Sequence, residues 1–431
     1  MKRLHGGPRF RDERDVKLLR CLPVDEGEGT KLRWLSAGPC VAERREHKAV
    51  EVDARRDVAH RKIDMVEHSR ILTARVTFPH ARPSKRSIPD AVRSRRIIRR
   101  VRALVLGGTG FIGSFAVKEL MRRGHDVTVF HRHRGHTGLP RELDHIHDEF
   151  LNVPLHHDEF RRFAPEVVLD MVPYIDKHGH GVLHLRGIAR RAVVITSADV
   201  YRAFARLWRS ELGPPDPVPL TEESPLRARR APDASNEDRG FDNVEVEQAV
   251  VIDPAFPVTI LRFPATHGPG DPQHRLARYL RPMVDDRPAI VLSETLAAWR
   301  WARGYVENVA VAIALAVADE RATARTYNVA GIDAVTEGEW VRQIAESLGW
   351  GGEIVVIPDD ELPEPLRQPY DFTQHMELDT SAIRSELGFR ETVDESEGLR
   401  RTIEWELKTL DEVPNLRLDY GAEDEALTAR F

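Results

Sequence analysis

Three glycines at regular spacing offer the clearest chemistry in this chain. Gly107, Gly110 and Gly113 follow the apolar run ALVL and precede a stretch with helical periodicity. The first glycine permits a tight turn, the second lets the backbone approach a phosphate, and the third lets the helix lie close to its strand. Amide N–H groups at the helix start, around Phe111 and Ile112, would then face an anion. We therefore predict a dinucleotide site here, with a purely structural turn as the alternative.

The end of the next apolar strand indicates which dinucleotide would bind. Residues Val127–Phe130 are followed by His131, Arg132, His133 and Arg134, with no carboxylate among them. A carboxylate at this place receives the ribose hydroxyls of NAD, whereas the 2′-phosphate of NADP requires cations. The planar fork of Arg132, with Arg134 as a second candidate, favours NADP over NAD. The alternative is a solvated basic loop without a ligand.

The elements around these residues predict the fold class. Apolar strands at 103–106, 127–130, 167–172 and 192–196 alternate with helical segments, one of them near 182–190. Such alternation is typical of an α/β fold, a doubly wound parallel sheet of the Rossmann type with helices on both faces. We expect the strand order 3-2-1-4-5-6-7, with the ligand crevice at the carboxyl ends of the strands, where 172–174 and Ser197 fall.

The rest of the chain divides into further segments. We expect an N-terminal extension at 1–100, a nucleotide-binding domain at 101–262, and a smaller substrate-binding portion with a helical tail at 263–431. Residues 211–240 form a long irregular insertion that could act as a lid. Later elements are helices at 244–251, 306–318, 337–348 and 396–410, strands at 258–261, 326–329 and 354–357, and a loop at 264–271.

The first hundred residues differ in charge from the remainder. They carry 26 Lys and Arg against 14 Asp and Glu, whereas the rest carries 38 against 55. The segment has no sustained helical or strand period, and it is open to three interpretations: a disordered basic tail, a small separate domain, or sequence upstream of the true start. We favour the third and expect no nucleic-acid partner, because a basic run is usually only solvated.

Cysteine use and apolar runs bear on the compartment. Cys21 and Cys40 are the two cysteines of the chain, which fits a reducing cytoplasm without a disulfide framework. The longest apolar run, Val309–Ala318, has 10 residues, fewer than the roughly 20 that span a bilayer. We expect a cytoplasmic protein with no membrane partner. Its oligomeric state is open, and a homodimer is one alternative.

Histidines are frequent in one stretch. Eleven lie between His125 and His184, several of them as HxH pairs. A metal site requires three or four ligands that converge, with supporting groups behind them. Local pairs rarely achieve this, so we expect no bound metal.

Six motifs in order resemble one known family. They are GGTGFIG, ITSADVY (195–201), VEQAV (246–250), ILRFPATHGPGD (260–271), YVENVAVAIALAV (305–317) and YNVAG (327–331). Over residues 101 to about 390 the chain resembles the extended and atypical short-chain dehydrogenase/reductases, the NAD(P)-dependent epimerase/dehydratase family. The resemblance implies the Rossmann fold, a nicotinamide cofactor, and an acidic residue that accepts the adenine amine. Glu149, or Asp148 beside it, matches that acidic residue after the short strand 144–147.

The same resemblance implies a proton relay, and the chain departs from it. In that family a Tyr exchanges the substrate proton, a Lys four residues later lowers the Tyr pKa, and a Ser orients the substrate oxygen. Ser197 matches the Ser, whose alternative role is to cap the next segment. The Tyr and Lys positions fall on Arg239 and Asn243, neither of which can serve.

Other side chains are candidates to replace the missing relay. Phe241 lies where related members keep a Tyr, but a phenyl ring has no proton to give. Tyr201 and Tyr174 are substitutes near the crevice, although a Tyr there is more often a packing residue. His267 replaces a Tyr of the related loop, where it could titrate near neutrality or only hydrogen-bond the backbone.

Two functions follow from these residues. The first is an NAD(P)-dependent oxidoreductase or epimerase/dehydratase-like enzyme that acts on a hydroxyl or carbonyl of a small, sugar-like substrate. The second is a nucleotide-binding regulator or binding protein that has lost the relay. We favour the enzyme, and the sequence leaves its substrate open.

Overall fold

The computed structural model describes residues 99–132, 138–140, 142–172, 175–176, 179–228, 242–414, 416 and 418–430, with 175–176 and 179–180 described by their backbone alone. The predictions for residues 1–98 and for Arg134, Tyr174, Arg239 and Phe241 lie outside this part of the chain. All described residues belong to one unit, 90–431. The predicted division at residue 262 therefore stays a prediction.

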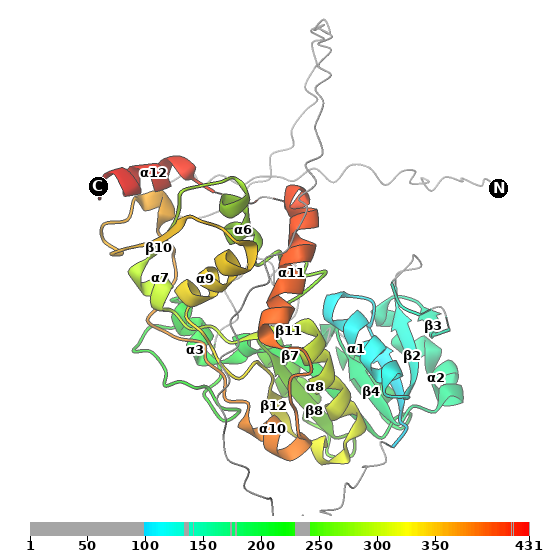
Figure 1. Ribbon diagram of the computed structural model, residues 1–431. Coiled ribbons are helices and arrows are strands. Elements are labelled where there is room, and N and C mark those ends of the chain that lie inside the picture. The colour runs from blue at the N-terminus through cyan, green and yellow to red at the C-terminus, as the bar shows by residue number, and fades with distance from the viewer. Residues whose placement is uncertain are drawn as a thin grey trace, which may run out of the picture. The chain divides into compact units, whose positions relative to one another are not determined.

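A seven-stranded parallel sheet forms the centre of the described chain (Figure 1). In spatial order its strands are β3 (Asp144–His147), β2 (Asp126–His131), β1 (Arg102–Leu106), β4 (Val167–Asp170), β7 (Arg191–Ser197), β8 (Val258–Phe263) and β12 (Thr326–Asn328). This order confirms the predicted 3-2-1-4-5-6-7 arrangement. Because the winding direction reverses between β1 and β4, a ligand crevice is expected at their carboxyl ends.

Helices cover both faces of the sheet. One face carries α1 (Phe111–Arg122) and α8 (Val306–Ala318), and the other carries α2 (His157–Phe163) and α5 (Asn243–Val250). Side chains alternate along a strand, so Val105 packs in the first core and Leu104 in the second. Burial on both faces explains why the strands are continuous apolar runs rather than alternating ones.

A third apolar core lies beside the sheet, mostly among elements that follow β8. It is built by α3 (Arg202–Leu207), α6 (Ala277–Val284), α7 (Glu294–Ala298), α9 (Glu337–Leu348) and α11 (Glu395–Thr409). The remaining elements are β5 (Ile175–Asp176), β6 (Gly179–His180), β9 (Ala265–His267), β10 (Ala289–Ser293), β11 (Arg303–Tyr305), β13 (Glu353–Ile357), α10 (Ser381–Leu387) and α12 (Tyr420–Thr428).

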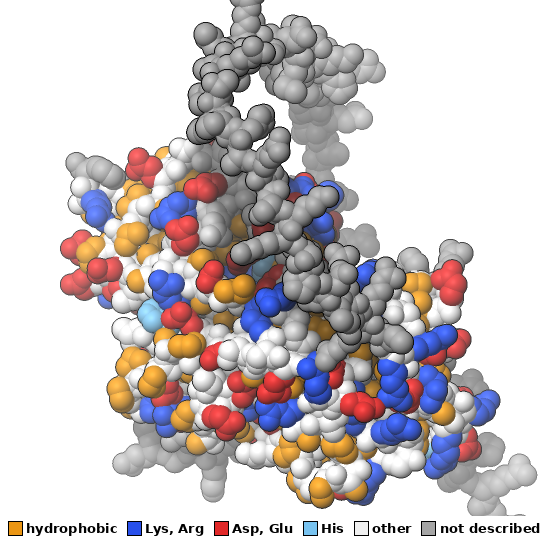
Figure 2. Space-filling model, turned by 60° about the horizontal axis from the view of Figure 1, so that its bottom comes forward, with side chains coloured by type: hydrophobic (Ala, Val, Ile, Leu, Met, Phe, Trp, Pro, Cys, Tyr) orange, Lys and Arg blue, Asp and Glu red, His pale blue; other side chains and the backbone are white. Residues whose placement is uncertain are grey.

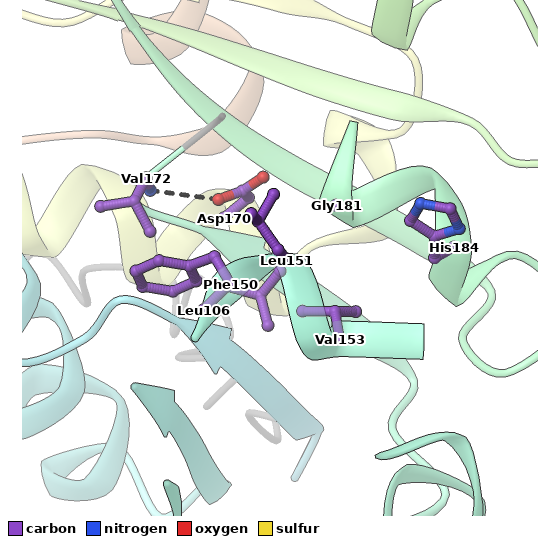
Figure 3. A pocket seen from close by; sticks show the side chains of 8 residues that line it. All are labelled: Leu106, Phe150, Leu151, Val153, Asp170, Val172, Gly181 and His184. Atoms are coloured by element: carbon purple, nitrogen blue, oxygen red, sulfur yellow. Dashed lines mark hydrogen bonds between the residues drawn. The ribbon is translucent and has the colours of Figure 1, made fainter. Parts of the chain in front are cut away.

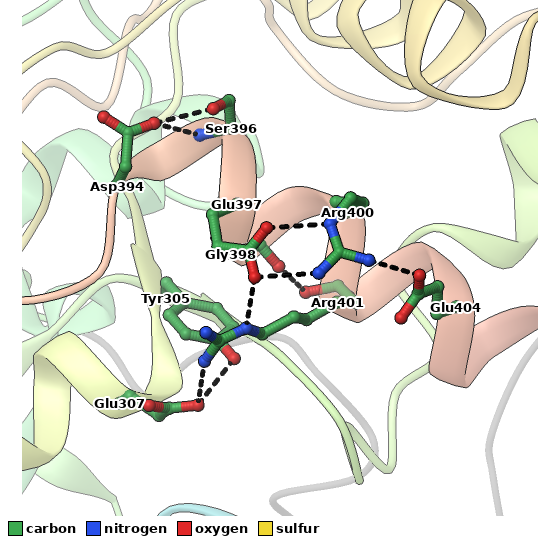
Figure 4. Close-up of polar contacts among 10 residues, drawn as sticks. Tyr305, Glu307, Asp394, Ser396, Glu397, Gly398, Arg400, Arg401 and Glu404 are labelled. Carbon is green, nitrogen blue, oxygen red and sulfur yellow. Dashed lines mark hydrogen bonds and ion pairs between the residues drawn. The ribbon is translucent and has the colours of Figure 1, made fainter.

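Helix α11 is tied to the rest of the fold at its first turns (Figure 4). Asp394 caps the helix by accepting from the backbone N–H of Ser396 at 3.0 Å. Arg401 bridges the helix to α8, because it donates to Glu397 at 2.8 Å and to Glu307 at 3.0 Å. These contacts hold the C-terminal elements against β11, where the Tyr305 hydroxyl donates to Glu307 at 2.9 Å.

Two predicted elements differ from those observed. The helix predicted near 182–190 is a short 3-10 turn at Gly181–Leu185, and Gly187, at φ 76°, lies in the left-handed region that ends a helix. The loop predicted at 264–271 contains the strand β9, which pairs in parallel with β11. A three-residue strand is too short to leave a periodic pattern in the sequence.

Charged side chains are spread over the visible face of the described residues (Figure 2). On the face in Figure 2 basic and acidic side chains of the described residues are interspersed. Among the described residues, we find no helix that combines the length and apolar character needed to cross a bilayer.

Candidate functional site

The three glycines of the loop between β1 and α1 have different surroundings. Gly107 has φ 80°, and a Cβ there would lie 2.4 Å from a Val172 methyl carbon. At Gly113 a Cβ would lie 3.0 Å from backbone atoms of the loop itself. At Gly110, by contrast, a Cβ would meet nothing within 4 Å. The packing of the fold therefore requires glycine at Gly107 and Gly113, whereas Gly110 faces open space.

The start of α1 beside that space is suited to an anion. Gly110 is the N-cap, no side chain caps the helix, and its first turn has no acidic residue. The first N–H groups of a helix lack partners within the helix and carry the positive end of its dipole. The backbone at Phe111 and Ile112, which are both partly buried, thus borders the open volume. A pyrophosphate fits this arrangement.

The end of β2 borders the same loop, because the Gly107 N–H donates to the Phe130 carbonyl at 2.9 Å. His131 ends the strand with 1% of its surface exposed, and Arg132 follows it as an exposed side chain. We find no ion pair of Arg132 with any described residue. Its guanidinium is available to a ligand, as the NADP prediction requires.

The two acidic residues after β3 differ in their availability. The hydrogen bond from His156 at 2.8 Å lowers the pKa of Asp148 to about 2, and Asn152 donates to the other oxygen at 2.8 Å. Glu149 is exposed, and no described residue pairs with its carboxylate. Of the two, Glu149 is therefore the carboxylate left free to accept an adenine amine.

A buried carboxyl group lies at the end of β4, next in the sheet to β1. Asp170 is 2% exposed, burial raises its pKa to about 7, and it accepts from the Val172 N–H at 3.1 Å. It lines a small cavity with Leu106 and Phe150 (Figure 3). The sequence analysis missed Asp170, although a lone acid inside the apolar run VVLDMV is the signal that could have found it.

The end of β7 carries a polar network that includes Ser197. Its Oγ accepts from the Asp199 N–H at 3.2 Å, so the hydroxyl caps the next turn and keeps its own proton available. The Asn243 Nδ2 group of α5 lies 3.0 Å from each carboxylate oxygen of Asp199. Arg227 lies 3.9 Å from that carboxylate and 2.7 Å from Asp242.

Asp199 is the titratable group of this network. Its side chain is 15% exposed, and burial raises its pKa to about 6, against the opposing effect of Arg227. Asn243, which occupies the position of the family's Lys, therefore holds a carboxylate rather than a phenolate. The sequence analysis did not single out Asp199, because nothing local indicates that residues 28 and 44 positions later surround it.

Tyr201, the candidate to replace the relay Tyr, is held inside the fold by its hydrogen bonds. It is fully buried, and its hydroxyl donates to Asn328 at 2.6 Å and accepts from Arg262 at 3.0 Å. Burial raises its pKa above the ordinary value, which makes it a poorer base than a free phenol. These contacts suit a structural role, and Tyr201 has no part in the chemistry proposed below.

His267 is also buried, on β9. Its Nδ1 lies 3.1 Å from the Thr402 hydroxyl, and burial, with Arg303 and Arg275 nearby, lowers its pKa to about 3. It stays neutral at physiological pH, so the expectation that it titrates near neutrality is wrong. Its partner is a side chain rather than the backbone.

The fold and the glycine loop define a dinucleotide-binding α/β protein of the Rossmann class. Residues 103–193 match the NAD dependent epimerase/dehydratase family. This match agrees with the resemblance of the sequence motifs to the extended short-chain dehydrogenases/reductases. The family is NAD-dependent, and the six motifs extend the likeness beyond the matched residues.

Two curated proteins are similar to this chain in sequence, and a solved structure is similar to it in fold. A UDP-glucose 4-epimerase of Lactobacillus helveticus is 31% identical over 143 residues, which are 29% of this chain and 41% of the epimerase. A dTDP-glucose 4,6-dehydratase of Streptomyces niveus is 26% identical over 71% of this chain and 92% of its own length. The structure of a UDP-glucose 4-epimerase from Stenotrophomonas maltophila, with bound NAD and formylated UDP-arabinopyranose, matches with a TM-score of 0.55. That structure has 18% identity and covers 73% of this chain and all of the other.

Proposed function

We propose that this protein is an NAD(P)-dependent oxidoreductase of the epimerase/dehydratase type that acts on a sugar nucleotide. The observation that carries the proposal is the open volume at Gly110, in front of an uncapped helix start, at the same sheet edge as the Ser197–Asp199 network. The names of the relatives, an epimerase of UDP-glucose and a dehydratase of dTDP-glucose, supply the substrate class.

The coenzyme would lie along the carboxyl ends of β1, β2 and β3. The loop from Gly107 to Gly113 would hold the pyrophosphate, and Glu149 would accept the adenine amine. Arg132 would contact a 2′-phosphate, which supports NADP over NAD because no carboxylate ends β2 to receive the ribose hydroxyls. When bound, a nicotinamide supplies the acceptor for hydride; the chain must supply the acceptor for the proton.

Ser197 and Asp199 are the residues we assign to the proton. When a secondary alcohol becomes a carbonyl, hydride leaves the carbon and a proton leaves the oxygen. The Ser197 hydroxyl would donate to the substrate oxygen and fix its position. Asp199, with a pKa of about 6, is ionised at neutral pH and is a carboxylate that can take the proton through that hydroxyl or a water.

Turnover of sugar nucleotides tests the proposal. We expect purified protein with NADP⁺ or NAD⁺ to convert UDP-glucose or dTDP-glucose, measured by product chromatography. Conversion should disappear in Ser197→Ala with coenzyme affinity unchanged. If Ser197→Ala turns over normally, the assigned network is not the active site.

A second function is favoured by one observation. Asn243 stands in place of the relay Lys, and Tyr201 is buried, so no Tyr–Lys pair exists among the described residues. A protein that binds the coenzyme and has no turnover on any sugar nucleotide would be a nucleotide-dependent regulator. A cytoplasmic location, a homodimeric assembly and the absence of nucleic-acid or membrane partners stay predictions with either function.

A further inference from the structure

Three histidines converge at the edge of the sheet, outside the groups assigned to the proposed reaction. His131 on β2 stands opposite His147 on β3 in the parallel register, and His145 lies two residues before His147 on the same face. One ring nitrogen of each of the three lies within 4.8 Å of the others. Strand pairing, and not sequence proximity, therefore brings the three imidazoles together.

The rings are ordered relative to one another. His145 and His147 are parallel, with an interplanar angle of 2° and centroids 5.7 Å apart. The His131 ring stands edge-on to both, with centroids 5.0 Å from His145 and 4.5 Å from His147. His131 Nε2 and His145 Nδ1 lie 2.8 Å apart and share one hydrogen. Two ring nitrogens of the cluster are thus already in direct contact, with the third ring beside them.

The chemistry of the cluster favours a metal over an anion. An anion site would need the imidazoles protonated, and three positive charges at this separation repel one another. Neutral imidazoles present lone pairs, and they are the common ligands of Zn²⁺ and related divalent transition metals.

We propose that His131, His145 and His147 form a binding site for a divalent transition metal of the Zn²⁺ class. Ligand nitrogens about 2.1 Å from a tetrahedral Zn²⁺ lie about 3.4 Å apart. The hydrogen-bonded pair need only separate slightly as the metal replaces the shared hydrogen. His147 is exposed, so its ring is free to close the remaining distance and the fourth position is left to water.

This proposal replaces the expectation of no bound metal, and it places a metal ion near the proposed coenzyme site. His131 immediately precedes Arg132, at the strand end that borders the glycine loop. A metal here lies on the adenosine side of the proposed dinucleotide site, remote from Ser197 in sheet order. Its role is therefore structural or regulatory rather than in the proton transfer.

Calorimetric titration of the full chain with ZnCl₂, in a buffer that does not chelate metals and without an affinity tag, tests the site. We expect one stoichiometric site whose affinity falls by about 10-fold or more in His147→Ala and is lost in His145→Ala/His147→Ala. His375→Ala, which alters a histidine far along the chain, should bind as the unaltered protein does.

The proposal is overturned if the double variant binds Zn²⁺ like the unaltered protein, or if the unaltered protein has no stoichiometric site. Far-UV circular dichroism confirms that each variant is folded. Should the double variant fail to fold, Co²⁺ added to the unaltered protein decides: strong visible absorption typical of tetrahedral coordination supports the site, and a spectrum of hydrated Co²⁺ refutes it. Neither readout depends on turnover, so the proposed function can fail independently.

Discussion

The carboxyl ends of β1 and β7 lie at the same edge of the parallel sheet, and these two halves of the proposed site differ in construction. At β1 the loop leaves backbone accessible, because Gly110 faces open space and no side chain caps α1. At β7 the equivalent region is filled, because Asp199 is held by Asn243 and Arg227. Binding of an extended anion needs exposed backbone, whereas control of a proton needs a carboxyl group in a defined, partly dry environment. The first half tolerates little change of side chain, and the second permits replacement of the family's relay by another group.

The largest effect should come from removing the titratable group of the filled half. Asp199→Asn keeps the shape and the hydrogen-bonding ability but loses the carboxylate. We expect kcat to fall by about 10² to 10⁴ with little change in coenzyme affinity. Kinetics on the best sugar nucleotide measure this, with Asp158→Asn as the matched control at an exposed acid.

The same carboxylate predicts the pH profile. A base with a pKa of about 6 must be ionised, so kcat should fall as the pH drops below 6 and level off above about 7. Asp199→Asn should abolish this limb. If the pH profile of the variant is unchanged, the fall of kcat at low pH belongs to another group, and Asp199 is not the base at the end of β7.

The open half is best tested by a substitution that helps folding and hinders binding. Gly110 has φ −77° and is the N-cap, so Asp fits its backbone and is a preferred N-cap residue. We expect Gly110→Asp to keep or raise Tm while weakening NADPH and NADH binding by about 100-fold, through repulsion of the pyrophosphate. Gly110→Ala is the control for bulk alone. Unchanged binding in the Asp variant would place the anion elsewhere.

Asp170 lies between the two halves and predicts a pH-dependent stability. Its folded pKa of about 7 exceeds the unfolded value of about 3.9, so the folded state binds the proton more tightly. The stabilisation is complete below about pH 4 and is lost as the pH rises through 7, by about 2–3 kcal/mol between pH 5 and pH 8. Urea unfolding at both pH values should show this loss, and Asp170→Asn should remove most of it. An equal loss in the variant would mean that Asp170 is not its source.

The smallest effect concerns coenzyme choice. Arg132→Ala should weaken NADPH binding by about 10-fold and leave NADH binding unchanged, because only the former has a 2′-phosphate. Calorimetry with both coenzymes measures the ratio, and Arg123→Ala, at the far end of α1, is the matched control. Equal affinities for the two coenzymes in the unaltered protein would remove the case for NADP.

The sequence by itself determined what depends on near neighbours. The glycine spacing specified the turn from β1 to α1, since the residues involved lie within seven positions of one another. Apolar runs located most strands of the sheet, and the parallel winding of such alternating elements fixed their order. The nucleotide end of the site could therefore be predicted before any coordinates.

Only the tertiary structure decided which side chains meet across elements. Burial in the folded chain raises the pKa of Asp199, and Arg227 and Asn243, on segments that approach it only after folding, oppose that shift. His131 meets His145 and His147 because β2 and β3 pair in one particular register, and a shift of one residue would turn the rings to opposite faces. Burial and register arise from the whole packing, and a local pattern of residue types does not carry that information.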